Sequence, residues 1–199
     1  MTTGNFSPSV VGWTGIATGI AVILAVIFLT LMATVNSSLG KVNDVFNSLI
    51  GISSVVLAWM LYAEYHAKSP LMSQIGLVLA AIGAIFTIIG SVLIIFGYTD
   101  FVLTGWYTGI GNALIGLWLA VFCTSMLSGG TLPHNLVVFG LVAGGFMVMG
   151  LLGIPGILAR VDTMESLPWY LGVAYLGFLG TYILYPIWTI WLGRILLSR

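Results

Sequence analysis

The chain has 199 residues, of which 60% are hydrophobic and only 5% are charged. A soluble domain typically carries about 25% charged residues, so this composition excludes a water-soluble globule and predicts an integral membrane protein. Five basic and five acidic residues provide no basic surface for nucleic acid, which is therefore not expected as a partner. The single cysteine excludes an internal disulfide and any multi-cysteine metal site.

Six apolar stretches are long enough to cross a membrane, because a transmembrane helix needs about 20 mainly apolar residues. The predicted spans are residues 10–35, 48–65, 74–98, 101–126, 136–158 and 169–197. These runs are continuously apolar, whereas the strands of a membrane barrel alternate, so the predicted fold class is all-α. No linker or second domain fits between the spans. Residues 1–199 are therefore interpreted as a single transmembrane domain, a polytopic bundle of six helices with short loops.

An even number of spans places both chain ends on one side of the membrane. That side would carry Lys68, Arg194 and Arg199, and the opposite side would carry Lys41 and Arg160. Cytoplasmic loops carry an excess of Lys and Arg. The count therefore predicts that both termini lie in the cytoplasm.

Aromatic and charged residues cluster near the predicted span ends, where Trp and Tyr form belts at the headgroup level of a bilayer. The expected anchors are Trp13, Trp59, Tyr62, Tyr65, Trp188 and Trp191 on the terminal side and Tyr98, Trp106, Tyr107, Trp169 and Tyr170 on the other. A solvated rim is expected to hold Lys41, Asp44, Asp100, Arg160, Asp162 and Glu165. Every charge except Glu64 is then expected at a helix end or in a loop, and Glu64 is only a turn from an end, which argues against a proton pump or a carboxylate-coupled transporter.

Small residues predict where the third and fourth spans meet, because they allow transmembrane helices to approach closely. Glycines recur at seven-residue intervals in the third span, and small residues follow a similar face of the fourth. The predicted packing seam consists of Gly76, Gly83, Gly90, Gly97, Gly105, Gly109, Asn112 and Gly116. We expect a tight antiparallel hairpin in which Asn112 donates a hydrogen bond across the seam; lining of a substrate cavity by Asn112 is the alternative.

Two prolines are candidate hinge residues. Pro155 follows a glycine-rich stretch of the fifth span, and Pro186 lies within the sixth. Proline removes a backbone hydrogen bond and kinks a helix, and such a kink either moves or only shapes the bundle. The similarity of residues 12–16 to residues 105–110 would fit inverted repeats of the kind found in transporters.

Glu64, His66 and His134 are the candidates for a metal site, since imidazole and carboxylate groups suit transition metals. Residues two positions apart, such as Glu64 and His66, do not share a helix face. The favoured interpretation is therefore a polar interfacial rim, with no metal ligand and no catalytic residue assigned. No catalytic or cofactor motif is present, so the cofactor stays unknown and the chain is interpreted as not an enzyme.

The sequence of the last span, residues 182–194, together with residues 111–118, is similar to small uncharacterised six-helix integral membrane proteins of bacteria. The resemblance covers the second half of the chain. It implies a bacterial inner-membrane location and no known activity, so it transfers no functional residue.

Two functions remain open from the sequence. The preferred hypothesis is a non-catalytic protein, either an accessory or scaffold subunit of a membrane assembly or a binder of a lipid-like ligand such as a lipid, quinone or pigment. Apolar spaces between helices are natural sites for such ligands. The alternative is a small permease or channel for a neutral or lipophilic solute. Besides the lipid bilayer, the expected partners are other membrane subunits or a second copy of the chain.

Overall fold

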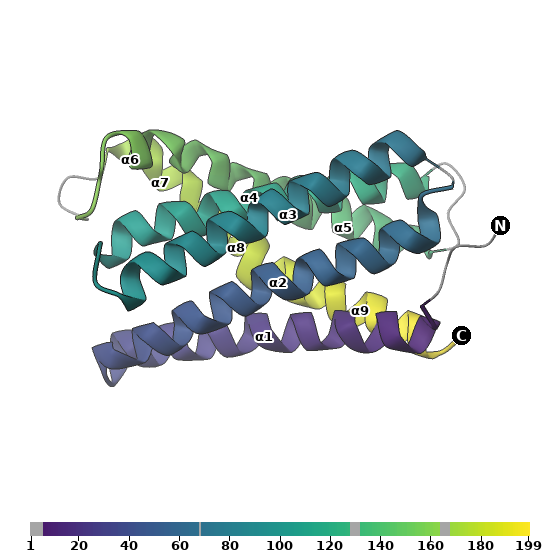
Figure 1. The fold of residues 1–199 in the computed structure, drawn as a ribbon, viewed down its shortest axis with the longest axis horizontal. Coiled ribbons are helices and arrows are strands. Elements are labelled where there is room, and N and C mark those ends of the chain that lie inside the picture. Colours follow the sequence, from purple (N-terminus) through teal and green to yellow (C-terminus); the bar gives the residue numbers. More distant parts are fainter. Residues whose placement is uncertain (1–5, 68, 128–131, 164–167) are drawn as a thin grey trace.

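The protein is described by a computed structural model over residues 6–67, 69–127, 132–163 and 168–199. Within these ranges the chain is helical and contains no strand, and six helical segments are long and apolar enough to span a membrane. The segments run antiparallel in chain order, so that the beginning of the first and the end of the last lie at the same end of an elongated bundle (Figure 1). The predicted all-α fold of six membrane-spanning helices is confirmed.

The first four spans are continuous helices. They are α1 (Pro8–Thr34), α2 (Gly40–Tyr65), α3 (Pro70–Ile95) and α4 (Phe101–Leu127), and a 3₁₀ turn, η1 (Ser37–Leu39), leads into α2. Helix α3 packs between α2 and α4, while α1 packs against α2 and α9. Proline stands at the start of α1 and of α3, where its missing N–H would be unpaired in any case.

The fifth and sixth spans are interrupted. The fifth consists of α5 (His134–Val148), the 3₁₀ segment η2 (Met149–Gly153) and α6 (Ile154–Leu158). The sixth consists of α7 (Trp169–Gly172), η4 (Val173–Tyr175), α8 (Leu176–Leu179), the π-helical segment η5 (Gly180–Leu184) and α9 (Tyr185–Leu197). Pro155 and Pro186 are the second residues of α6 and α9, and each of these helices directly follows a non-α segment.

The two interruptions lie against each other, because η2 packs on η4 and α8. A Cβ atom added to Gly177 would stand only 2.7 Å from the backbone nitrogen of Gly150. The corresponding spans of the first half, α2 and α3, are uninterrupted, whereas inverted-repeat transporters break their helices in matching positions. The breaks therefore form one local contact between neighbouring spans.

The second span begins earlier than the sequence predicted. We expected it to start at residue 48, but α2 begins at Gly40 and includes Asn43, Asp44 and Asn47, all at most 4% exposed. Polar residues lower the hydropathy of this stretch without ending the helix, because they are paired or enclosed inside the bundle. The correction moves a carboxylate from the expected rim into the protein.

The α3 half of the predicted seam lies against α4. A Cβ atom on Gly83 would stand 2.6 Å from the carbonyl oxygen of Gly111, and one on Gly90 would stand 2.8 Å from Thr108 Oγ1. Gly76 faces the Trp118 ring in the same way, at 3.0 Å. At Gly83 the contact is with backbone, so the helices are as close as glycine permits.

The α4 half of the seam was predicted on the wrong face. Gly105 has no atom within 4 Å of its Cβ position, Gly109 reaches only Phe178, and Gly116 faces α5 at the carbonyl oxygen of Gly144. Helix α4 has several helical neighbours, so it carries small residues on more than one side. Gly97 is not a packing residue either: its φ of +74° ends α3 in the left-handed conformation that favours glycine.

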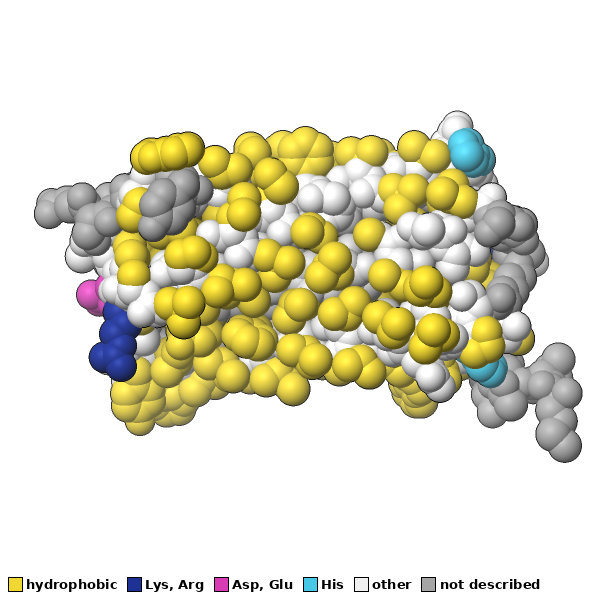
Figure 2. Space-filling view, turned by 90° about the horizontal axis from the view of Figure 1, so that it is seen from above, with side chains coloured by type: hydrophobic (Ala, Val, Ile, Leu, Met, Phe, Trp, Pro, Cys, Tyr) yellow, Lys and Arg dark blue, Asp and Glu magenta, His cyan; other side chains and the backbone are white. Residues whose placement is uncertain are grey.

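Hydrophobic side chains cover most of the visible midsection of the bundle, while the acidic and basic groups visible in that view lie at one end and the histidines near the other (Figure 2). Trp13 and Trp169 are 63% and 85% exposed, in keeping with anchors. Trp106, Trp188 and Tyr65 are at most 4% exposed, so their expected role as anchors is wrong. Position along a span cannot reveal which side of a helix a ring occupies.

The terminal half of the bundle is filled by packed aromatic rings. Trp118 and Phe122 of α4 meet Trp188 of α9 edge to face, each with ring centroids 6.3 Å apart. Tyr65 adds an edge contact to Phe122 at 5.8 Å. The opposite half contains the cavity described next.

Candidate functional site

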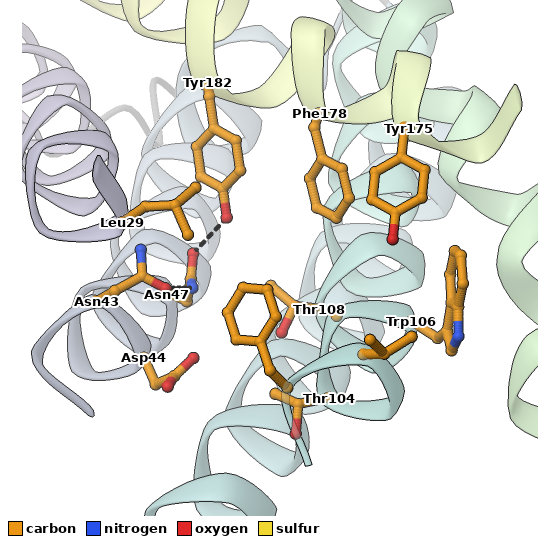
Figure 3. A pocket seen from close by; sticks show the side chains of 13 residues that line it. Leu29, Asn43, Asp44, Asn47, Thr104, Trp106, Thr108, Tyr175, Phe178 and Tyr182 are labelled. Atoms are coloured by element: carbon orange, nitrogen blue, oxygen red, sulfur yellow. Dashed lines mark hydrogen bonds between the residues drawn. The ribbon is translucent and has the colours of Figure 1, made fainter. Parts of the chain in front are cut away.

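A cavity of about 220 Å³ lies in the half of the bundle away from the chain termini. Its walls come from four parts of the fold: Leu29 of α1, the beginning of α2, the first two turns of α4, and the interrupted part of the sixth span. In Figure 3 the side chains of the sixth span hang over the space between α2 and α4. Phe101, at the rim of the cavity, is 43% exposed.

One wall is a chain of hydrogen bonds that starts on α1 and ends on η5. Asn43 Nδ2 donates to the carbonyl oxygen of Ala25 at 2.8 Å, and Asn47 Nδ2 donates to Asn43 Oδ1 at 3.0 Å. Tyr182 OH then donates to Asn47 Oδ1 at 3.0 Å. Buried amides are costly unless paired, and these bonds fix α1, α2 and the sixth span relative to one another.

Asp44 stands beside this chain and points into the cavity (Figure 3). Its side chain is 2% exposed, and Oδ2 has no hydrogen-bond partner. Within the described part of the chain, no Lys, Arg or His lines the cavity. The prediction that Asp44 lies in a solvated rim is therefore wrong. The second span was predicted to begin at residue 48, which left Asp44 outside it, whereas α2 begins at Gly40 and includes Asp44.

A second wall is a continuous row of aromatic rings. Trp106 meets Tyr175 edge to face at 5.6 Å, Tyr175 lies 5.4 Å from Phe178, and Phe178 stacks on Tyr182 at 5.6 Å with an interplanar angle of 10°. All four line the cavity. The non-α turns η4 and η5 contribute Tyr175 and Tyr182, so the interruption of the sixth span helps to position this row.

Helix α4 carries a polar stripe at four-residue spacing that leads from the cavity toward the middle of the bundle. Thr104 and Thr108 line the cavity, and Asn112 is the next residue of the stripe. Thr104 Oγ1 shares a hydrogen bond with Thr99 Oγ1 at 2.9 Å. Thr108 Oγ1 and both polar atoms of the Asn112 amide are buried without a partner.

The predicted hydrogen bond from Asn112 across the seam is therefore not formed. The seam of α3 otherwise offers glycine and alanine, and its one threonine, Thr87, donates to the carbonyl oxygen of Ala84 in its own helix. Asn112 does not line the cavity either. It stands as a buried, unsatisfied amide one turn deeper than the cavity wall.

The segment after α6 holds the beginning of α4 in place. Asp162 accepts backbone hydrogen bonds from Asp100 N at 3.1 Å and Leu103 N at 3.0 Å, which caps α4. Trp106 Nε1 donates to the carbonyl oxygen of Val161 at 3.1 Å. The sequence predicted Asp162 in a solvated polar rim. In the structure its carboxylate holds the first turn of α4, which borders the cavity.

The three weak metal candidates lie at the other end of the bundle. Glu64 and His134 are exposed, while His66 stacks on Tyr62 at 5.1 Å and has a buried Nδ1 without a hydrogen-bond partner. Figure 2 shows the histidine surfaces apart from each other. Among the residues that the structure describes, no three His, Cys, Asp or Glu side chains group as metal ligands.

Sequence reasoning missed most of the cavity, but a signal was present. Asn43, Asp44 and Asn47 are spaced as on one side of a helix, directly before an apolar run. Polar residues with helical spacing beside a membrane span are candidates for a site. The aromatic row carried no comparable signal, because its members resemble interfacial anchors in the sequence.

Comparison with family models, with curated proteins and with solved structures finds no match for this chain. The resemblance of its second half to small bacterial membrane proteins therefore stays a prediction. The fold and the cavity define the class: a multi-pass α-helical membrane protein with a partly open cavity near one end of its bundle, lined mainly by apolar and aromatic side chains with a few polar groups.

Proposed function

We propose that this protein binds a small lipophilic molecule, or the head of a larger amphiphile, in the cavity beside Asp44. The observation that carries the proposal is the cavity itself: about 220 Å³ enclosed by aromatic rings on one side and fixed polar groups on the other. Ligand sites are concave and mostly apolar, with a few placed polar groups that orient the ligand. Drug-sized ligands occupy roughly 300–1,000 Å³, so this space suits a smaller group.

The cavity favours the binding hypothesis over that of a purely structural subunit. A bundle that works only through external contacts gains nothing from an interior space, because unfilled volume costs van der Waals contact. The hydrogen-bond chain from Ala25 to Tyr182 also fixes the polar wall before any ligand arrives. A preformed wall lowers the entropic cost of binding.

A matched pair of glycine substitutions tests this proposal. Gly105 lines the cavity and Gly145 of α5 is exposed, and neither has an atom within 4 Å of its Cβ position. Gly105→Phe would fill the cavity, whereas Gly145→Phe would place the same ring on the outer surface. The measurement is native mass spectrometry of protein gently extracted from its own membrane.

The expected result is a small molecule of defined mass on the wild-type chain and on Gly145→Phe, and its loss from Gly105→Phe. A wild-type chain without such a molecule, or equal retention by Gly105→Phe, would contradict the proposal. A co-purifying protein of defined stoichiometry in place of a small molecule would support the accessory-subunit hypothesis.

A second candidate function is a small permease for a neutral or lipophilic solute. It is favoured by the unpartnered Thr108 and Asn112, which extend the polar lining inward, and by the interrupted spans beside them. Irregular backbone at membrane depth is tolerated where it lines a cavity or is buried in protein. A solute path would run from the cavity along this stripe of α4.

Proteoliposomes with an imposed glycerol or urea gradient test the permease by stopped-flow light scattering. Transport that falls in Asn112→Leu and in Pro186→Ala, but not in Gly145→Ala, would support a path along α4 with a hinge in the sixth span. Wild-type vesicles that swell no faster than protein-free vesicles would remove this candidate for these solutes.

We further propose a bacterial inner-membrane location with both termini in the cytoplasm. The positively charged residues described at the terminal end are Arg194 and Arg199, and Lys41 and Arg160 lie at the other. The predicted excess of basic residues at the terminal end depends on Lys68, which lies outside the described residues. In right-side-out membrane vesicles, a membrane-impermeant thiol reagent is expected to label Asp100→Cys and not Ser198→Cys.

A further inference from the structure

Among the described residues that line the cavity, Asp44 is the one carboxylic acid, and none of them is Lys, Arg or His. Asp44 is 2% exposed, and its Oδ2 has no hydrogen-bond partner. A buried carboxylate is tolerated when a cation and hydrogen bonds balance it. A ligand that enters the cavity can supply the positive charge that balances the Asp44 carboxylate.

The facing wall suits a cation of a particular kind. Trp106, Tyr175, Phe178 and Tyr182 form one continuous row of rings with neighbouring centroids 5.4–5.6 Å apart. An organic ammonium group is attracted to the face of such rings when it lies within about 6 Å of the ring centre. A negatively charged ligand would meet the Asp44 carboxylate without any compensating group.

A metal ion fits this cavity poorly. Calcium takes roughly 6–8 oxygen ligands and magnesium demands near-ideal octahedral geometry, whereas Asp44 is the one carboxylate of the lining. Its polar neighbours are amides and hydroxyls, and the remaining wall is aromatic or aliphatic. An organic cation instead uses both the carboxylate and the rings.

We infer that the ligand of this cavity carries an organic ammonium group, which pairs with Asp44 while the apolar part of the ligand packs against the aromatic row. This inference rests on the proposed function, since it names the chemical class of the ligand. The volume of about 220 Å³ admits a small aromatic or alkyl ammonium, or the ammonium head of a lipid whose chains stay in the bilayer.

The test is a calorimetric titration of the full chain in maltoside micelles with two probes of similar size. One is 2-phenylethylammonium at neutral pH, and the other is the uncharged 2-phenylethanol. The wild-type protein is expected to bind the ammonium at least about tenfold more tightly, because a buried charge that loses its partner costs several kcal/mol. Gly105→Phe is expected to bind neither probe.

Substitutions assign the preference to the site. Asp44→Asn is expected to abolish the preference for the ammonium while keeping 2-phenylethanol binding. Asp100→Asn, which removes an exposed carboxylate at the same end of the bundle, is expected to keep the preference. Phe178→Leu should weaken ammonium binding more than alcohol binding, and it provides an independent test if Asp44→Asn does not fold.

The outcomes separate this inference from the proposed function. Equal binding of both probes, abolished by Gly105→Phe, would overturn the cationic ligand and leave the binding cavity standing. A preference for the ammonium that survives in Asp44→Asn and in Phe178→Leu would also overturn the inference. Binding of neither probe by the wild-type protein would count against both proposals.

A competition step identifies the source of the ammonium group. Dihexanoylphosphatidylcholine added to the micelles is expected to displace 2-phenylethylammonium if the site holds a lipid headgroup, and to leave it bound if the site takes a water-soluble cation. Either result agrees with the inference.

Discussion

Tyr182 reaches from the π-helical segment of the sixth span to α2, where its hydroxyl donates to Asn47 Oδ1 at 3.0 Å. Three residues further, Tyr185 forms a second hydrogen bond to α2, with Ser54 at 2.8 Å. The two tyrosines thus connect an interrupted span to a continuous one, and the bond of Tyr182 lies in the wall of the cavity. The π turn widens the helix beside this contact.

Removal of the Tyr182 hydroxyl should loosen this connection. Tyr182→Phe is expected to cost about 1–3 kcal/mol, because Asn47 Oδ1 is left buried without its donor. The measurement is thermal unfolding in detergent followed by circular dichroism. Tyr98→Phe is the control, since Tyr98 is 74% exposed, and an equal loss in both variants would contradict a specific role for Tyr182.

Gly83 should tolerate no added methyl group. A Cβ atom there would stand 2.6 Å from the carbonyl oxygen of Gly111, so Gly83→Ala must push α3 away from α4. The expected cost is about 1–3 kcal/mol, seen as a lower unfolding temperature. Gly145→Ala, with no atom within 4 Å, is expected to leave stability unchanged or raise it slightly. Equal stability of Gly83→Ala and the wild type would show that the helices are further apart than described.

Asn112 should be replaceable without loss of stability. Both polar atoms of its amide are buried without a partner, and such atoms cost about 1–3 kcal/mol of desolvation each. Asn112→Leu is therefore expected to raise the unfolding temperature. A marked decrease would mean that the amide has a partner, such as a bound water or ligand, and would return Asn112 to the functional residues.

Asp162 should stabilise both α4 and the rim of the cavity. Its carboxylate accepts from the backbone nitrogens of Asp100 and Leu103, and loss of such a cap costs about 0.5–2 kcal/mol. Asp162→Ala is expected to lower the unfolding temperature and to speed hydrogen exchange in the first turn of α4. Glu64→Gln, a change at an exposed carboxylate of the other end, serves as the control. Unchanged exchange at Leu103 would exclude a capping role.

The sequence by itself determined the class of the molecule. Apolar runs of about 20 residues in a chain with so few charges are typical of transmembrane helices, and their lengths specified the spans within a few residues, apart from the late start predicted for the second. The glycines of α3 also predicted a face that lies close to α4, because a seven-residue repeat of one small residue type marks a single side of a helix.

The tertiary structure alone decided the functional candidates. Asp44, Trp106 and Asp162 each looked like surface residues in the sequence, yet they line or support one cavity. Gly105 and Gly116 looked like one seam, but Gly116 faces α5 whereas Gly105 lines the cavity with no atom within 4 Å of its Cβ position. The physical reason is that hydropathy reports how deep a residue lies in the membrane, whereas a site depends on the side of the helix that each residue occupies. Which side of its helix faces the cavity is decided by the packing of all six spans together.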